Sequence, residues 1–210
     1  MNANTNNTNQ AITINDAGIA EQATWIASPN FDARLPTETA DETTAKQTAT
    51  AVSTQVDIQP AELICLIVIH NISLPPNQFG GNGIVELFTN CLNPEEHPYY
   101  AEIYTRRVSA HFLIRRDGSL LQFVSCLHRA WHAGVSQWQG RERCNDFSVG
   151  IELEGADDIA FEAAQYSTLN QLIAALKAQY NIADITGHSD IAPGRKTDPG
   201  PYFDWAQLND

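Results

Sequence analysis

Two stretches of the chain have the hydrophobic pattern of strands. Leu63–Ile69 contains only hydrophobic residues and ends at His70, which is typical of a strand buried on both faces. Val149–Glu154 alternates instead, so its apolar side chains share one face and Glu152 points to the other. Hydrophobic residues recur at helical spacing from Leu169 to Tyr180, which predicts an amphipathic helix covering one face of the sheet.

Shorter elements complete the predicted fold. We expect strands over Val108–Arg115 and Leu120–Val124, joined by a hairpin turn at Asp117-Gly118. A short helix is expected near Ile84–Asn90, and a short segment over Ala183–Gly187 leads into a loop rich in polar residues. Strands that alternate with helices predict an α/β fold built around one sheet.

Composition indicates one domain with two poorly ordered segments. The 210 residues, 43% of them hydrophobic, can bury one good core. Residues 1–21 begin with an Asn/Thr-rich tract, which predicts a disordered or loosely ordered N-terminal tail. Residues 36–58 are rich in Thr and Ala and predict a flexible insert.

The charge distribution limits the possible partners. A formal net charge of -13 argues against binding to nucleic acid, because phosphate recognition requires clustered Lys and Arg. Most of the few cations nevertheless fall in the second half of the chain, so a local basic cleft would suit a small anionic ligand. They are Arg106, Arg107, Arg115, Arg116, Arg129, Arg141, Arg143, Arg195 and Lys196.

Cysteine usage and hydropathy predict a cytoplasmic protein without a membrane partner. Cys65, Cys91, Cys126 and Cys144 show no paired spacing, so we expect reduced thiols and not a disulfide framework. Neither a signal-peptide pattern nor an apolar run of bilayer length is present in the sequence. We expect a monomer.

The stretch Thr186–Pro201 carries most of the candidate chemistry. It places His188, Asp190, Lys196 and Asp198 on a segment whose Gly and Pro residues prevent a long helix. A catalytic zinc usually takes three protein ligands, so a further ligand must come from elsewhere. His70 is the best candidate, because a histidine at the end of a buried strand lies at the rim of the sheet. The hypothesis is a Zn²⁺ site formed by His70, His188 and Asp198.

Spacing by itself leaves this hypothesis open. No HExxH motif or paired CxxC fixes two ligands on one element. His70 could instead be a hydrogen-bonded histidine at a strand end, and Asp198 before Pro199 could start a turn.

Three separated stretches carry a family resemblance. His70–Pro76, Gly140–Gly155 and Gly187–Trp205 closely resemble the AmpD-type 1,6-anhydro-N-acetylmuramyl-L-alanine amidases. These belong to the zinc amidase superfamily, which also contains the peptidoglycan recognition proteins. The resemblance implies a mixed central β-sheet flanked by helices, with a catalytic domain over residues 59–210. It also implies that residues 22–35 form an N-terminal segment packing on that domain.

The resemblance also assigns roles in the reaction. Glu152 matches the carboxylate that activates the zinc-bound water, and Lys196 matches a lysine thought to stabilise the oxyanion. Glu154 shares the face of Glu152 and is a weaker candidate for support. The implied cofactor is Zn²⁺, and the implied reaction is cleavage of the amide between (1,6-anhydro-)N-acetylmuramic acid and L-alanine. The implied setting is cell-wall recycling.

The implied substrate is an anhydro-muropeptide, a fragment that carries several carboxylates. Asn71 and Arg107 match substrate-contacting positions, and Arg195 is a further candidate through guanidinium–carboxylate pairing. His132, in Trp131–Gly134, is either a substrate-binding residue or a structural histidine. His111 is expected to pack or to support a ligand.

Other functions are compatible with parts of the pattern. The main alternative is a peptidoglycan-fragment-binding protein of the same fold that lacks catalysis, although all four residues of the implied centre are present. A Cys-His hydrolase could use Cys144 with His132 or His188, provided that the thiol is activated. A secreted autolysin is not supported by any wall-binding repeat.

Overall fold

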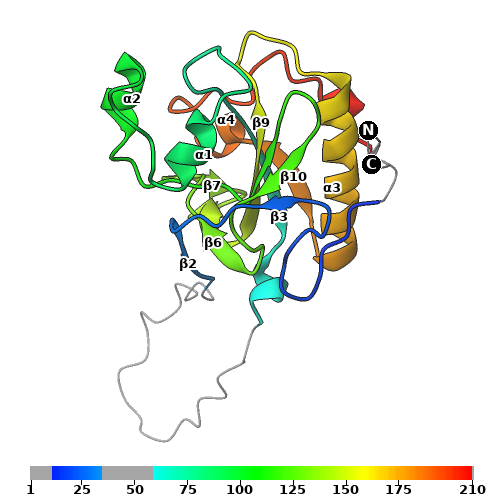
Figure 1. Cartoon of the computed structure of the whole chain (residues 1–210). Helices are drawn as coiled ribbons and strands as arrows, with labels where there is room; N and C mark the ends of the chain where they lie inside the picture. Colours follow the sequence, from blue (N-terminus) through cyan, green and yellow to red (C-terminus); the bar gives the residue numbers. More distant parts are fainter. Residues whose placement is uncertain (1–10, 35–58, 210) are drawn as a thin grey trace, which may run out of the picture.

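The computed structural model describes residues 11–34 and 59–209, shown in Figure 1. Within these ranges one sheet has six strands in the order β1-β5-β4-β9-β3-β10. In that order the bounds are Thr24–Trp25, Leu120–Gln122, Phe112–Ile114, Ser148–Glu154, Leu66–Ile72 and Asp184–Gly187. All neighbours are parallel except β4 and β5, which form the predicted antiparallel hairpin. The predicted mixed sheet is therefore confirmed.

Helix α3, Ala163–Gln179, covers one face of the sheet (Figure 1). Its apolar side packs into a buried cluster with the alternating residues of β9 and with Ile67 and Ile69 of β3. The predicted helical spacing is confirmed, because Leu169, Leu172, Ile173, Leu176 and Tyr180 all lie in that cluster. Each fully buried Leu or Ile contributes roughly 1.5–3 kcal/mol relative to an exposed one, so this layer anchors the two central strands.

Shorter helices cover the opposite face. Leu113 and Leu121 pack there with α1 (Gly83–Phe88) and α2 (Pro98–Ile103), while Leu66 and Val68 pack with Ile191 of α4 (His188–Ile191). The alternation of β3 continues on this face to His70. A sheet face that is apolar at one end and carries a histidine further along is suited to holding a polar site.

The remaining elements are short. Two small sheets pair β2 with β6 and β7 with β8, and three 3-10 turns complete the described chain. Their bounds are Phe31–Ala33 (β2), His128–Ala130 (β6), Gln137–Trp138 (β7), Arg141–Glu142 (β8), Pro60–Leu63 (η1), Cys144–Asp146 (η2) and Trp205–Gln207 (η3).

Two of the differences from the expected strand limits concern β3 and β4. His70 lies inside β3 and not at its end, because β9 pairs with β3 as far as Ile72. The strand expected over Val108–Arg115 is reduced to Phe112–Ile114, since Ser109 and His111 donate their backbone N–H groups to Trp131 and Gly150 outside the β4 ladder.

The N-terminal residues pair with the rest of the described chain at two points. Thr24 and Trp25 pair with β5, and Phe31–Ala33 pairs with β6. Residues 1–10 and the whole expected insert 36–58 lie outside the described residues. Residues 11–21 show more order than expected of a tail, because a bridge between Ile14 and Ala20 closes a loop and both residues are buried.

None of the described helices combines the length and hydropathy that crossing a bilayer requires.

Candidate metal centre

Three groups far apart in the sequence converge on one point. The Nδ1 atoms of His70 and His188 are 2.9 Å apart, and each lies 3.0 Å from Oδ2 of Asp198. The two histidines are buried and the side chain of Asp198 is 14% exposed. Among the described residues this is the one such cluster of metal-ligating groups. The structure thus brings together the three residues predicted from sequence.

The strand order explains this convergence. β10 pairs with β3 so that Gly187 lies opposite Ile69, which places His188, the next residue, beside His70. Asp190 accepts hydrogen bonds at Oδ2 from the Gly187 backbone and from Thr186 Oγ1, which fixes the start of α4. The backbone N–H of Ser189 donates to the Asp198 carbonyl, and this tie brings the carboxylate back to the histidines.

The donor set fits a divalent cation such as Zn²⁺. Two ligands about 2.0–2.1 Å from a tetrahedral zinc lie roughly 3.3–3.4 Å apart, close to the spacing of these three atoms. Burial lowers the pKa of His70 to about 4, so its imidazole is the neutral form that metals bind. Burial alone would raise the pKa of Asp198, but the adjacent imidazoles of His188 and His70 hold it well below its usual value. The residues therefore offer two imidazoles and one carboxylate.

Glu152 lies next to this cluster. It is the register partner of His70 on the neighbouring parallel strand, and its side chain is buried. Its Oε2 atom is buried without a hydrogen-bond partner among the described residues. Burial, together with the negative charge of Asp198, raises the pKa of Glu152 well above its usual value, against the lowering effect of Lys196. A buried carboxylate with an unused oxygen is suited to accept a proton from a reacting group.

These groups line a cavity of about 570 Å³. His70, His188, Asp198, Glu152 and the exposed Lys196 all contribute to its wall. Tyr99 and Trp131 add aromatic surface, and Asp157 and Asp158 add carboxylates. A space of this size accommodates a small ligand with both polar and apolar parts.

Glu154 is placed differently from Glu152 although both lie on β9. Its carboxylate accepts hydrogen bonds from the backbone N–H groups of Gly80 and Arg116 and from Nη1 of Arg115 at 3.1 Å. The carboxylate of Glu154 is therefore used to hold neighbouring parts of the protein together, which is a structural role.

The predicted substrate contacts are dispersed. Asn71 lines the cavity, but its Nδ2 donates to Oδ1 of Asp157 at 2.6 Å and to the carbonyl of Pro199 at 3.0 Å. Arg107 is exposed and off the cavity wall, where its Nη1 donates to the carbonyls of Tyr104 and Arg106. The neighbouring Arg106 lines the cavity instead.

Arg195 and His132 contact the residues around the cluster. Arg195 lines a second cavity of about 600 Å³ and donates to the carbonyls of Ala133 and Val135 at 2.7 and 2.6 Å. The ring of His132 borders the main cavity, and its Nδ1 lies 2.9 Å from Nε2 of His70. His132 thus supports the ligand His70 directly, and Arg195 supports His188 through the backbone carbonyl of Ala133.

Other expected residues have structural surroundings. His111 is buried, accepts at Nδ1 from the Gly150 backbone and lies 3.0 Å from the His128 carbonyl through Nε2, as expected of a packing residue. All four cysteines are free, and burial raises the pKa of the Cys144 thiol. A raised pKa disfavours the thiolate that a Cys-His hydrolase needs.

The sequence reasoning missed Asn145 and Ser148. Both make hydrogen bonds to His132, through Asn145 Oδ1 and Ser148 Oγ. The one available signal was a cluster of polar residues directly before a buried strand, and such a cluster occurs in many turns.

Known proteins resemble this chain over most of its length. A family profile described as N-acetylmuramoyl-L-alanine amidase matches residues 60–201. The 1,6-anhydro-N-acetylmuramyl-L-alanine amidase AmpD of Escherichia coli (strain K12) is 61% identical over 145 residues, 68% of this chain and 79% of that protein. The protein of the same name from Haemophilus influenzae is 54% identical over 145 residues, again 68% of this chain and 79% of that protein.

Solved structures agree with this likeness. A crystal structure of a selenomethionine derivative of AmpD matches with a TM-score of 0.78 at 49% identity, covering 92% of this chain and 96% of that chain. The structure of AmiD from E. coli with the substrate anhydro-N-acetylmuramic acid-L-Ala-D-γ-Glu-L-Lys matches with a TM-score of 0.52 at 30% identity. That match covers 78% of this chain and 63% of the other. The chain belongs to the N-acetylmuramoyl-L-alanine amidase family.

Proposed function

We propose that this protein is a zinc-dependent amidase that cleaves the amide between (1,6-anhydro-)N-acetylmuramic acid and L-alanine in peptidoglycan turnover fragments. The observation that carries the proposal is the triangle of His70, His188 and Asp198 beside the buried carboxylate of Glu152. The relatives that match the chain over two thirds of its length carry the name of this activity.

The three ligands would hold Zn²⁺, and Glu152 would move the proton. When bound, Zn²⁺ supplies a Lewis acid that acidifies water and polarises a carbonyl. Glu152 takes a proton from the water as its oxygen attacks the lactyl carbonyl carbon. The C–N bond then breaks, and Glu152 returns the proton to the leaving amino group of L-alanine. Lys196, on the cavity wall, stabilises the negative charge on the carbonyl oxygen during the attack.

Substrate binding is proposed for four residues around the centre. Asn71 and His132 line the main cavity, whereas Arg107 and Arg195 lie off it. The arginines supply positive charge for the carboxylates of the peptide. The complex of AmiD with an anhydro-muropeptide supports a ligand of this class.

The proposal extends to domain organisation and cellular setting. Residues 59–210 form the catalytic domain, and residues 22–35 pack on it, consistent with the strand pairs of β1 and β2. The four cysteines of the protein are free, in keeping with a role in cytoplasmic cell-wall recycling.

The test combines hydrolysis with metal analysis. An anhydro-muramyl tripeptide and its non-anhydro counterpart are incubated with the purified protein, and zinc is measured in the same preparation. We expect one zinc per chain, release of the peptide, and loss of both zinc and activity in His188→Ala. His128→Ala is the matched control, because His128 is exposed and is not a member of the three-residue cluster.

Two outcomes would overturn the proposal. Activity that survives complete removal of metal by a chelator would exclude the zinc mechanism. Tight binding of the tripeptide by zinc-loaded protein without any hydrolysis would favour the fragment-binding alternative.

A further inference from the structure

Two consecutive residues contact both histidine ligands. The ring of His132 meets His70, with 2.9 Å between Nδ1 of His132 and Nε2 of His70. The carbonyl of Ala133, the next residue, lies 3.1 Å from Nε2 of His188. The orientation of both imidazoles therefore depends on the His132–Ala133 step of one loop.

We infer that Asn145 is a positioning residue of the metal centre, whose side-chain oxygen clamps the His132–Ala133 step so that His70 and His188 both present Nδ1 to the metal. The inference rests on the proposed function, because that function requires a metal ion in the three-ligand cluster.

The tautomer of His188 follows from its carbonyl partner. A carbonyl oxygen can only accept, so Nε2 of His188 carries the hydrogen that it donates to Ala133 at 3.1 Å. Arg195 Nη2 lies farther from this nitrogen, at 3.5 Å, and donates to the same carbonyl at 2.7 Å. In a neutral imidazole the other nitrogen then has the free lone pair. That nitrogen is Nδ1, the atom 3.0 Å from Oδ2 of Asp198.

The tautomer of His70 follows from a longer chain of hydrogen bonds. Ser148 Oγ donates its single hydrogen to the Cys144 carbonyl at 2.6 Å, so toward His132 it acts as an acceptor. It therefore accepts from Nε2 of His132 at 3.3 Å. Nδ1 of His132 is then the acceptor for Nε2–H of His70, which leaves Nδ1 of His70 free for the metal.

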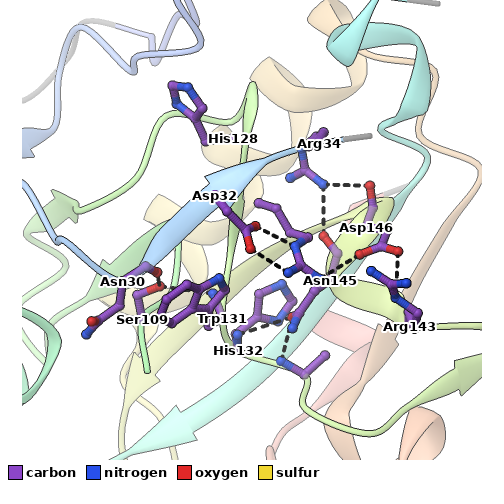
Figure 2. Close-up of polar contacts among 12 residues, drawn as sticks. Asn30, Asp32, Arg34, Ser109, His128, Trp131, His132, Arg143, Asn145 and Asp146 are labelled. Carbon is purple, nitrogen blue, oxygen red and sulfur yellow. Dashed lines mark hydrogen bonds and ion pairs between the residues drawn. The ribbon is translucent and has the colours of Figure 1, made fainter. Parts of the chain in front are cut away.

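Asn145 fixes both contacts at once. Its Oδ1 accepts from the backbone N–H groups of His132 at 3.2 Å and of Ala133 at 2.8 Å. Figure 2 shows Asn145 directed at the backbone of this step, with dashed lines joining them. A carbonyl oxygen has two lone pairs, so one side chain satisfies two successive donors.

The turn that carries Asn145 is itself held in place by Arg34. Arg34 donates through Nη1 to the carbonyls of Asn145 and Asp146 at 3.0 and 3.1 Å, and through Nη2 to that of Ser148 at 2.6 Å. Arg34 is 3% exposed, and its guanidinium lies against the turn that carries Asn145 (Figure 2). Hydrogen bonds through Asn145 thereby link Arg34 of the N-terminal segment to the residues around the metal centre.

Zinc affinity is the quantity that tests the inference. Asn145→Leu removes the acceptor at similar size, and zinc binding is measured by competition with a chelator. Loss of a group that orients a metal ligand typically weakens metal affinity by about 10–100-fold, and this is the expected effect. Asn145→Asp keeps an oxygen acceptor at the same place and should restore most of the affinity.

Further readouts separate positioning from general stability. Asn170→Leu is the matched control, because Asn170 also ties chain segments, donating to the Gln207 carbonyl and accepting from the Asn209 backbone. We expect Asn170→Leu to keep wild-type zinc affinity. Imidazole ¹⁵N shifts of the zinc-loaded protein should show Nε2–H for both ligands in wild type and in Asn145→Asp. In Asn145→Leu, excess zinc should restore kcat.

Two results would contradict the role of Asn145. Wild-type zinc affinity in folded Asn145→Leu would overturn the inference, as would equal weakening in Asn170→Leu. If Asn145→Leu does not fold, Asn145→Ala in the same competition gives the same comparison. Failure of the wild-type protein to bind zinc would sink the proposed function itself, which is a different result.

Discussion

His70 and Glu152 are directly opposite each other in the parallel pair of β3 and β9. Opposite residues of a parallel pair point to the same face, so a metal ligand and the candidate base share one face of the sheet. Helix α3 packs on the opposite face of the sheet. The positions of His70 and Glu152 are fixed by the pairing of β3 with β9, which is the most extensive strand pairing in the sheet. The chemistry of the site is therefore built into the register of the sheet.

Replacing the candidate base should abolish turnover without loss of metal. Glu152→Gln keeps the shape of the side chain but removes the proton acceptor, so we expect kcat to fall by on the order of 10²–10⁴. Zinc content should remain that of wild type. Kinetics on the anhydro-muramyl tripeptide with metal analysis measures both.

Glu154→Gln is the control on the same strand. Because Glu154 pairs with Arg115 at 3.1 Å, its loss should lower the free energy of unfolding by roughly 1–3 kcal/mol. Its kcat should stay close to wild type. Equal loss of kcat in the two variants would contradict the role assigned to Glu152.

The neighbouring arginines Arg106 and Arg107 can be distinguished by the KM values of their alanine variants. Arg107→Ala should raise KM about tenfold or more, since a hydrogen bond to a charged group contributes about 1.5–3 kcal/mol. Zinc content should not change. Arg106→Ala is the matched comparison, because Arg106 lines the cavity and Arg107 does not. A raised KM in Arg106→Ala alone would transfer the substrate contact to Arg106.

Arg34 should be essential for stability. Burial lowers the pKa of its guanidinium to about 10, and its donors are directed at the carbonyls of Cys126, Asn145, Asp146 and Ser148. Arg34→Met leaves these acceptors without a partner, so we expect a loss of roughly 3 kcal/mol or more in urea unfolding. Arg34→Lys should recover little, because an ammonium cannot reproduce the planar fork. Wild-type stability in Arg34→Met would refute this.

Thiol reactivity should follow exposure. Cys91 is exposed, whereas Cys126 and Cys144 are buried, and burial raises the pKa of Cys126 to about 12. We expect an alkylating reagent to modify Cys91 first in the native protein and to reach Cys126 and Cys144 only after unfolding. Mass spectrometry identifies the sites. Protein alkylated at Cys91 should keep its kcat/KM, and loss of activity on that modification would revive a thiol mechanism.

Local pattern predicted the elements that carry the site. The apolar run before His70 indicated the central strand, and the alternation around Glu152 indicated which face it occupies, because side-chain direction in a strand depends only on neighbouring residues. The spacing from Leu169 to Tyr180 indicated α3 for the same reason. These features are confirmed by the packing of the two strands against that helix.

Local sequence therefore encodes the strands and helices, the face of each chemical side chain and the family likeness. The position of β9 and β10 on either side of β3, which brings Glu152 and His188 to His70, is visible only in three dimensions. The same holds for the contact of Arg195 with the Ala133 carbonyl and for the clamp of Asn145. Such contacts join residues far apart along the chain, and their formation depends on strand order and loop closure, which no local pattern encodes.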